Sequence, residues 1–319
     1  RSFLILVTAV SILCIWLNNI SSRIGIPTLL AFILLGIVFG NNGIWPVRFD
    51  NYNFAKETCT VALIFIMFYG GFGTRWEAVK PIVREAGLLA SLGVIMTAGL
   101  TGLFCHFALG WGWEESLLLG AVVSSTDAAS VFSVLRSKRL GLKNNTAPLL
   151  EVESGSNDPC AYMMTAIMLS VMNGTASGGK VAWMLFAQIL FGAGCGVGIA
   201  KLAVWGFRKL HLKADGFDSL YIFAVAVASY AIPDLIGGNG YLSAYLVGII
   251  LGNEELRDKK VLVNFFDGVT SLMQVLIFFQ LGLLARPALL HKAVLPAMAI
   301  FLFMLLLARP ATVFTMLTP

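Results

Sequence analysis

Long runs of apolar residues recur along the whole chain, and they constrain its fold more than any other feature of the sequence. A helix needs about 20 apolar residues to cross the ~30 Å hydrocarbon core of a bilayer, and fewer where it is short or broken. The sequence therefore predicts an all-α polytopic membrane protein. Its eleven predicted spans run roughly over residues 2–17, 26–40, 58–73, 85–109, 116–135, 146–172, 181–207, 217–232, 241–251, 261–284 and 293–317.

Composition excludes several other classes of protein. The 319 residues are 58% apolar and only 12% charged, about half the charged fraction of a soluble domain. Such a chain has too little polar surface to cover a core in water, which excludes a soluble enzyme, a disordered regulator and a nucleic-acid-binding protein. The five cysteines lie in apolar runs without a CxxC pair, so neither a disulfide framework nor a thiolate metal site is indicated.

Lysine and arginine are distributed unevenly between the predicted loops. Most of them fall in alternate loops, beginning with the loop that follows the first span. Because basic residues favour the cytoplasmic side, we expect these loops to be cytoplasmic and the N-terminus to lie outside. The chain starts at Arg1 and enters an apolar run at once, so we expect an excerpt of a longer protein without a visible cleavable signal.

Polar side chains interrupt two of the predicted spans at about the same depth. The fifth span contains Ser-Ser-Thr-Asp at residues 124–127, and the sixth contains Glu-Val-Glu-Ser-Gly-Ser-Asn-Asp at residues 151–158. At ~1.5 Å per residue, Thr126 lies about 15 Å and Asp158 about 18 Å from the start of its span, close to the midplane. An ionisable group at that depth is by default a candidate functional residue.

Residue spacing indicates how these groups are arranged. Ser154 and Asp158 are four residues apart and share a helix face, and Glu153 and Asn157 form a second such pair on the neighbouring face. Small polar residues such as Thr126 and its neighbours can leave the helix and offer backbone carbonyls to a cation. An all-oxygen ligand set suits an alkali ion better than zinc or copper.

Some of these residues also have a structural interpretation. Small polar runs often hold membrane helices together by hydrogen bonds. Asp127 can cap the N-terminus of a half-helix instead of binding an ion. Glu153 needs a cationic partner, and Arg309 in the eleventh span is the candidate for a structural ion pair beside the site.

The sequence around these residues resembles the monovalent cation:proton antiporter-1 family, specifically the bacterial NhaP-type exchangers of Na⁺ or K⁺ for H⁺. Four motifs carry the resemblance: SSTDAASVFSVL at residues 124–135, LEVESGSNDPCAYM at residues 150–163, FDNYNFA at residues 49–55 and ARPATVF at residues 308–314. The Asn157-Asp158 pair is similar to the ND signature of electroneutral exchangers. One departure is Ala128, which stands where the family usually has a proline.

The resemblance implies a role for each residue of the candidate site. Asp158 is expected to be the carboxylate shared by cation and proton, with Ser154 and the backbone of Thr126 as further ligands. Asn157 and Asp127 are expected to brace the crossing helices. Glu153 and Arg309 are expected to flank the site.

The resemblance also implies an inverted-repeat fold of about thirteen helices with a discontinuous fifth helix, of which the last two helices would be missing here. The chain is then one transmembrane domain, incomplete at its C-terminus, in a homodimer of the bacterial inner membrane. Scaffold helices are expected at about 1–73 and 217–284, core transport helices at about 85–172 and 288–319, and a linking helix at 181–207.

The expected function is secondary exchange of a monovalent cation for H⁺, which supports pH homeostasis, by competition of the two ions for Asp158. No enzymatic activity, cofactor or nucleic-acid partner is expected, only the bilayer and the transported ions. One alternative is a cation channel, which would carry net current. Another is an intramembrane aspartyl protease, because two midplane aspartates can share a proton; the sequence contexts of Asp127 and Asp158 differ from the GxGD type expected of that class.

Overall fold

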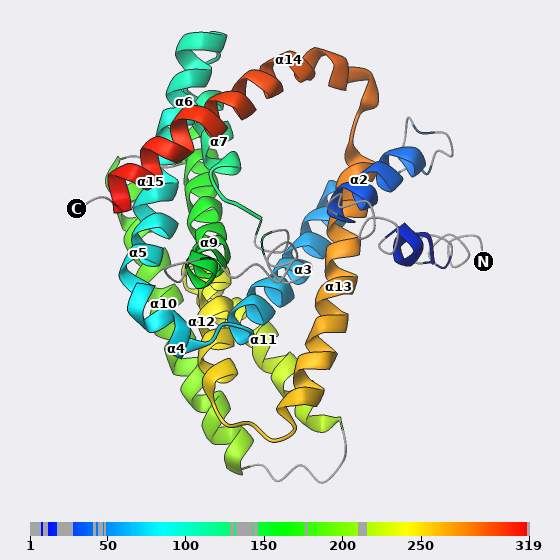
Figure 1. Cartoon of the computed structure of the whole chain (residues 1–319), viewed down its shortest axis with the longest axis vertical. Helices are drawn as coiled ribbons and strands as arrows, with labels where there is room; N and C mark the ends of the chain where they lie inside the picture. The colour runs from blue at the N-terminus through cyan, green and yellow to red at the C-terminus, as the bar shows by residue number, and fades with distance from the viewer. Residues whose placement is uncertain are drawn as a thin grey trace. The chain divides into compact units, whose positions relative to one another are not determined.

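The computed structural model describes residues 8, 12–17, 28–40, 43, 47, 49–127, 131, 142, 146–175, 178–209 and 216–317. In these ranges the regular elements are helices and no strand occurs, so the predicted all-α class is confirmed (Figure 1). The α-helices are α2 (Thr28–Phe39), α3 (Tyr52–Phe72), α4 (Trp76–Val79), α5 (Val83–Leu88), α6 (Val94–Leu109), α7 (Trp113–Val123), α9 (Thr146–Met172), α10 (Gly178–Lys209), α11 (Phe217–Leu235), α12 (Gly240–Asn253), α13 (Lys259–Leu284), α14 (Pro287–Phe303) and α15 (Arg309–Leu317).

These helices follow the predicted spans. Ten of the eleven predicted spans coincide, over nearly all of their described residues, with a helical segment, and the fifth is helical from its start to Val123. Six helical segments of the described chain are long and apolar enough to cross a bilayer, namely Tyr52–Phe72, Trp76–Leu109, Gly178–Lys209, Phe217–Leu235, Lys259–Leu284 and Pro287–Leu317. Most of the second half of the predicted fifth span, residues 128–130 and 132–135, lies outside the described residues, as do parts of the first span. The chain is a multi-pass membrane protein.

Some helices begin earlier than their apolar runs. The third span is predicted from residue 58, but α3 begins at Tyr52, because the Asn51 Oδ1 atom caps the helix by accepting the Phe54 N–H at 3.0 Å. The eleventh is predicted from residue 293, but α14 begins at Pro287, since proline is well suited to a first helical position. An apolar run therefore locates a helix but does not fix its first residue.

The chain divides into two compact units. The first unit comprises Arg1–Ile66 and Phe266–Val294. In it α2 crosses α13 closely, because a Cβ atom on Gly36 would overlap the Phe279 carbonyl and lie 2.8 Å from the Gly282 Cα atom. The predicted division into scaffold and transport helices is functional and stays a prediction.

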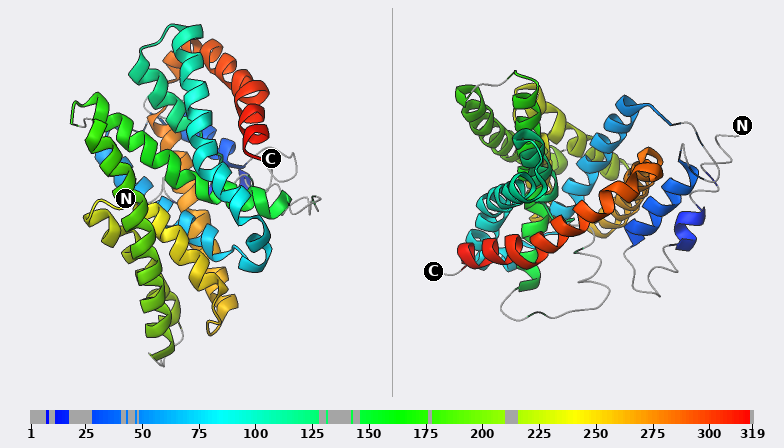
Figure 2. Two further views of the ribbon diagram at one scale, coloured as in Figure 1. Left: turned by 90° about the vertical axis from the view of Figure 1, so that its left-hand side faces the viewer. Right: turned by 90° about the horizontal axis from the view of Figure 1, so that it is seen from above.

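The second unit comprises Met67–Phe265 and Leu295–Pro319 and contains the candidate site. Glycines let two of its helix pairs approach closely. A Cβ atom on Gly192 of α10 would lie 2.8 Å from the Asn239 carbonyl at the start of α12, and one on Gly120 of α7 would overlap the Ala98 carbonyl of α6. Figure 2 shows α6 and α7 running side by side. These contacts fix the position of α7, whose end begins the site.

Candidate functional site

The fifth predicted span is broken at its polar residues. Helix α7 ends at Val123, and residues 124–127 are not helical. The Ser124 Oγ atom donates to the Ala121 carbonyl at 2.8 Å, a local hydrogen bond that competes with the backbone ladder. Beyond the break, the Val131 N–H donates to the Asp127 carbonyl at 3.1 Å, the spacing of one helical turn. The predicted discontinuous helix is confirmed, and it breaks without a proline.

Helix α9 carries the other half of the site and approaches α12 closely. Gly155 is buried, and a Cβ atom there would lie 3.0 Å from the Tyr245 ring. Pro159 lies inside α9 and has no N–H group, so the ladder hydrogen bond to the Gly155 carbonyl is missing. The Pro159 carbonyl itself accepts the Asn239 Nδ2 atom at 2.9 Å. Helix α9 runs on through this position but lacks one ladder hydrogen bond just after Asp158.

Four of the predicted site residues form one hydrogen-bond network. The Asn157 Nδ2 atom donates to Glu153 Oε1 at 3.0 Å and to Thr126 Oγ1 at 2.7 Å. The Thr126 Oγ1 atom also lies 2.9 Å from Ser154 Oγ and 3.5 Å from Glu153 Oε2. The broken end of α7 and the middle of α9 are thus joined through side-chain oxygens.

Arg309, the first residue of α15, joins both halves. Its Nη1 atom lies 3.2 Å from Glu153 Oε1, in an ion pair whose side chains are 21% and 7% exposed. Its Nη2 atom donates to the Ser124 carbonyl at 3.1 Å. The last carbonyls of a helix lack intrahelical partners, and a cation there also interacts favourably with the helix dipole. The predicted pair is present, and the Ser124 carbonyl is a contact that the sequence does not indicate.

Asp158 has different surroundings. It is partly buried, and it interacts with the Ser125 side chain and with the charges of Asp127 and Glu153. Among the residues that the structure describes, no basic side chain forms an ion pair with Asp158. Asp127 is exposed, and whether it caps a half-helix or contacts the ion stays a prediction. Asp158 thus differs from Glu153, which has Arg309 as a basic partner.

One buried side-chain oxygen, on the residue before Asp158, accepts no hydrogen bond within the described residues. The Asn157 side chain is fully buried, and its Oδ1 atom has no hydrogen-bond partner in the described part of the chain. The amide orientation follows from its neighbours, because the Glu153 carboxylate can only accept. A buried acceptor without a donor is costly unless something binds it. The possible ligand atoms gathered here are hydroxyl, amide and carboxylate oxygens, which suit a hard cation.

One residue of α12 and the residue that caps this helix support the site, and both were missed by sequence reasoning. Tyr245, which is 3% exposed, packs on Gly155, and Asn239 fixes the Pro159 carbonyl. Asn239 has a recognisable signal, since an asparagine after two glycines and before an apolar run is typical of a helix N-cap, and its Oδ1 atom accepts the Leu242 N–H at 3.0 Å. Tyr245 has no such signal in the sequence, because a tyrosine within an apolar run cannot be told from an ordinary core residue.

Comparisons with a family model and with known proteins point to the same family. The model of the family described as "Sodium/hydrogen exchanger, transmembrane" matches residues 8–319. The K(+)/H(+) antiporter NhaP of Alkalimonas amylolytica is 38% identical over 301 residues, which are 94% of this chain and 52% of that protein. The K(+)/H(+) antiporter NhaP2 of Shewanella baltica (strain OS223) is 37% identical over 316 residues, or 98% of this chain and 54% of that protein. The chain thus spans about half the length of these curated relatives.

A solved structure shares the fold. The sodium proton antiporter MjNhaP1 from Methanocaldococcus jannaschii at pH 8 superposes with a TM-score of 0.84 at 22% identity. The match covers 99% of this chain and 79% of that chain. The described helices therefore have the arrangement of an antiporter fold.

Proposed function

This chain belongs to the family of transmembrane sodium/hydrogen exchangers, and on that premise we propose that the whole protein is a secondary antiporter exchanging K⁺ or Na⁺ for H⁺. Relatives of this chain are named as K(+)/H(+) antiporters and a structural neighbour as a sodium proton antiporter, so the proposal covers both ions. The protein is proposed to be a transporter and not an enzyme.

The observation that carries the proposal is the difference between two carboxylates of α9. Glu153 is neutralised by Arg309, while Asp158 has no basic partner within the described residues. A negative charge at membrane depth is costly unless something neutralises it. A proton or a cation can do so, and each excludes the other because both take the same carboxylate oxygens.

In the proposed mechanism Asp158 is the shared group. The Ser154 hydroxyl and the backbone of Thr126 complete the cation site, and no cofactor takes part. The Asn157 amide links Glu153 to Thr126 and so holds the broken end of α7 against α9. In this mechanism the site changes the side of the membrane to which it is open only while Asp158 carries a cation or a proton. The protein then exchanges one ion for the other without net charge movement.

The cellular setting is proposed on the same basis. The uneven distribution of loop lysines and arginines supports an inner-membrane orientation with the N-terminus outside. A homodimer is proposed from the family resemblance.

The test is cation-driven proton flux in proteoliposomes of the full-length protein. Asp158→Asn keeps the size of the side chain and removes its titratable charge, so we expect flux at background level at every pH. The matched control is Glu115→Gln, which removes an exposed carboxylate from the first turn of α7 and is expected to keep flux. Retained exchange in Asp158→Asn refutes the proposal, and a net current in the wild-type protein indicates a channel instead.

A further inference from the structure

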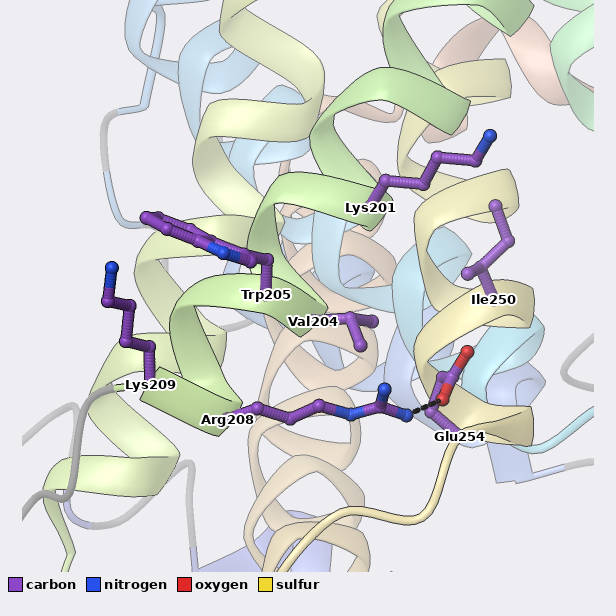
Figure 3. Close-up of a pocket in the computed structure, with 7 residues that line it drawn as sticks. All are labelled: Lys201, Val204, Trp205, Arg208, Lys209, Ile250 and Glu254. Atoms are coloured by element: carbon purple, nitrogen blue, oxygen red, sulfur yellow. Dashed lines mark hydrogen bonds and ion pairs between the residues drawn. The ribbon is translucent and has the colours of Figure 1, made fainter.

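A basic pocket lies on the second unit, away from the candidate cation site. It has a volume of about 470 Å³ and lies between the final turns of α10 and the last residues of α12. In Figure 3, Lys201 and Arg208 point from α10 toward α12, while Trp205 and Lys209 lie on the other side of α10. Ile250 of α12 gives the pocket an apolar wall.

The charge of the pocket is positive. Three of its residues are basic and exposed, and the one acidic residue among those lining it is Glu254, which pairs with Arg208 at 2.6 Å. The two side chains of that pair are 63% and 35% exposed, so the pair is weak and a competing anion can replace it. Lys201 forms no ion pair within the described residues. The pocket therefore favours an anion.

The helix terminus alone does not explain this charge. Basic residues in the last turn complement the helix dipole, which accounts for Arg208 and Lys209. Lys201 lies eight residues before the end of α10, about 12 Å deeper along the helix, beyond the range of that effect. A lysine at that depth is expected to extend toward the headgroup level of a bilayer.

The surroundings indicate a lipid as the source of the anion. Trp205 is 62% exposed and neighbours Leu202, which is 68% exposed, so this side of α10 presents apolar surface. Tryptophan is enriched at membrane interfaces, and here the Lys209 Nζ atom lies 4.8 Å from the Trp205 ring centre. A pocket that is basic at one end and apolar beside it matches a headgroup phosphate followed by acyl carbons.

We propose that this pocket binds the headgroup phosphate of an anionic phospholipid from the leaflet around the end of α10. Lys201 and Arg208 hold the phosphate, and the phosphate competes with Glu254 for Arg208. The proposal depends on the chain lying in a bilayer and not on the ions that it transports.

The test uses native mass spectrometry of the delipidated full-length protein with phosphatidylglycerol and phosphatidylcholine. We expect the wild-type protein to prefer phosphatidylglycerol. Lys201→Gln is expected to weaken the tightest phosphatidylglycerol binding about fivefold, the usual effect of one basic residue near anionic lipid. Glu254→Gln is expected to strengthen it, because Arg208 is released. The control Lys180→Gln removes an exposed lysine from the opposite end of α10 and is expected to have no effect.

Three results would overturn the proposal. One is equal binding of the two lipids by the wild-type protein. Another is an equal loss of phosphatidylglycerol in Lys201→Gln and Lys180→Gln. The third is displacement of phosphatidylglycerol by inorganic phosphate at matched concentration, which would identify a site for a free anion.

Discussion

Glu153 and Asp158 lie five residues apart on α9 and differ in their partners. Glu153 accepts from Arg309 and from Asn157, so its charge is compensated and its oxygens are occupied. Asp158 interacts with Ser125 and with other carboxylates, and within the described residues it has no basic partner. Glu153 is therefore the carboxylate with cationic and amide partners, and Asp158 is the one to which we assign the proposed ion binding.

Removing one side of the Glu153–Arg309 pair is expected to destabilise the protein strongly. Arg309→Gln leaves a buried carboxylate unpaired, at a cost of about 3–5 kcal/mol in the free energy of unfolding. The double variant Glu153→Gln/Arg309→Gln is expected to recover most of that loss. A double-mutant cycle in detergent measures both values.

The control for this cycle is Arg208→Gln, since the Arg208–Glu254 pair is largely exposed. Its loss is expected to cost no more than about 1 kcal/mol. A cost for Arg309→Gln as small as that for Arg208→Gln would show that Arg309 is not a structural partner of Glu153.

Which residues meet at the site was predictable, while their hydrogen bonds were not. Polar residues at membrane depth are rare, so Thr126, Ser154 and Asn157 stood out in an apolar chain, and the structure brings them together. The Arg309 contact with the Ser124 carbonyl was not predictable, because a backbone acceptor has no signature in a sequence. Tyr245 was missed for the related reason that its partner is a glycine.

Helix α7 is short, and its packing on α6 decides where its broken end lies. The two helices approach closely at Gly120, one turn before the break. A side chain at this position has to push the backbone of α6 away. The position of residues 124–127 thus depends on a contact made elsewhere on the element.

Gly120→Ala is expected to destabilise the protein by about 1–3 kcal/mol, as overpacking does in a close-packed core. Cation-driven flux is expected to fall as well, because the end of α7 shifts relative to α9. Gly99→Ala on α6 is the matched control, since a Cβ atom there meets nothing within 4 Å. That control is expected to be neutral or up to about 1 kcal/mol more stable, because alanine favours a helix. Equal stability of the two variants would contradict the packing argument, and thermal unfolding measures it.

The elements were predictable from apolar runs, but not their internal irregularities. Two segments, η2 (Leu89–Gly93) and η4 (Met304–Ala308), are π-helical inside otherwise continuous helices. Such an insertion adds one residue to a turn, and a run that is apolar on all sides gives no periodicity from which to detect it. In the structure η2 packs against α15, and the Thr97 and Thr312 hydroxyls lie 3.2 Å apart nearby.

At the scale of the whole molecule, the site is assembled from distant parts of the chain. Thr126 follows α7, the acidic pair lies on α9, and Arg309 begins α15, all within the second compact unit. The groups of the proposed ion site come from three segments, so the site exists only when the helices are folded together. The sequence could indicate each of these residues separately. That their side chains meet at one place follows from the packing of the helices.

Proton release on cation binding tests the central claim most directly. The full-length protein in weakly buffered detergent solution is titrated with K⁺ and separately with Na⁺, while a pH-indicator dye reports released protons. At a pH where Asp158 carries its proton, we expect binding of the transported cation to release about one proton per site, because both compete for one carboxylate. Asp158→Asn is expected to release none. Cation binding without proton release at every pH tested would contradict the account.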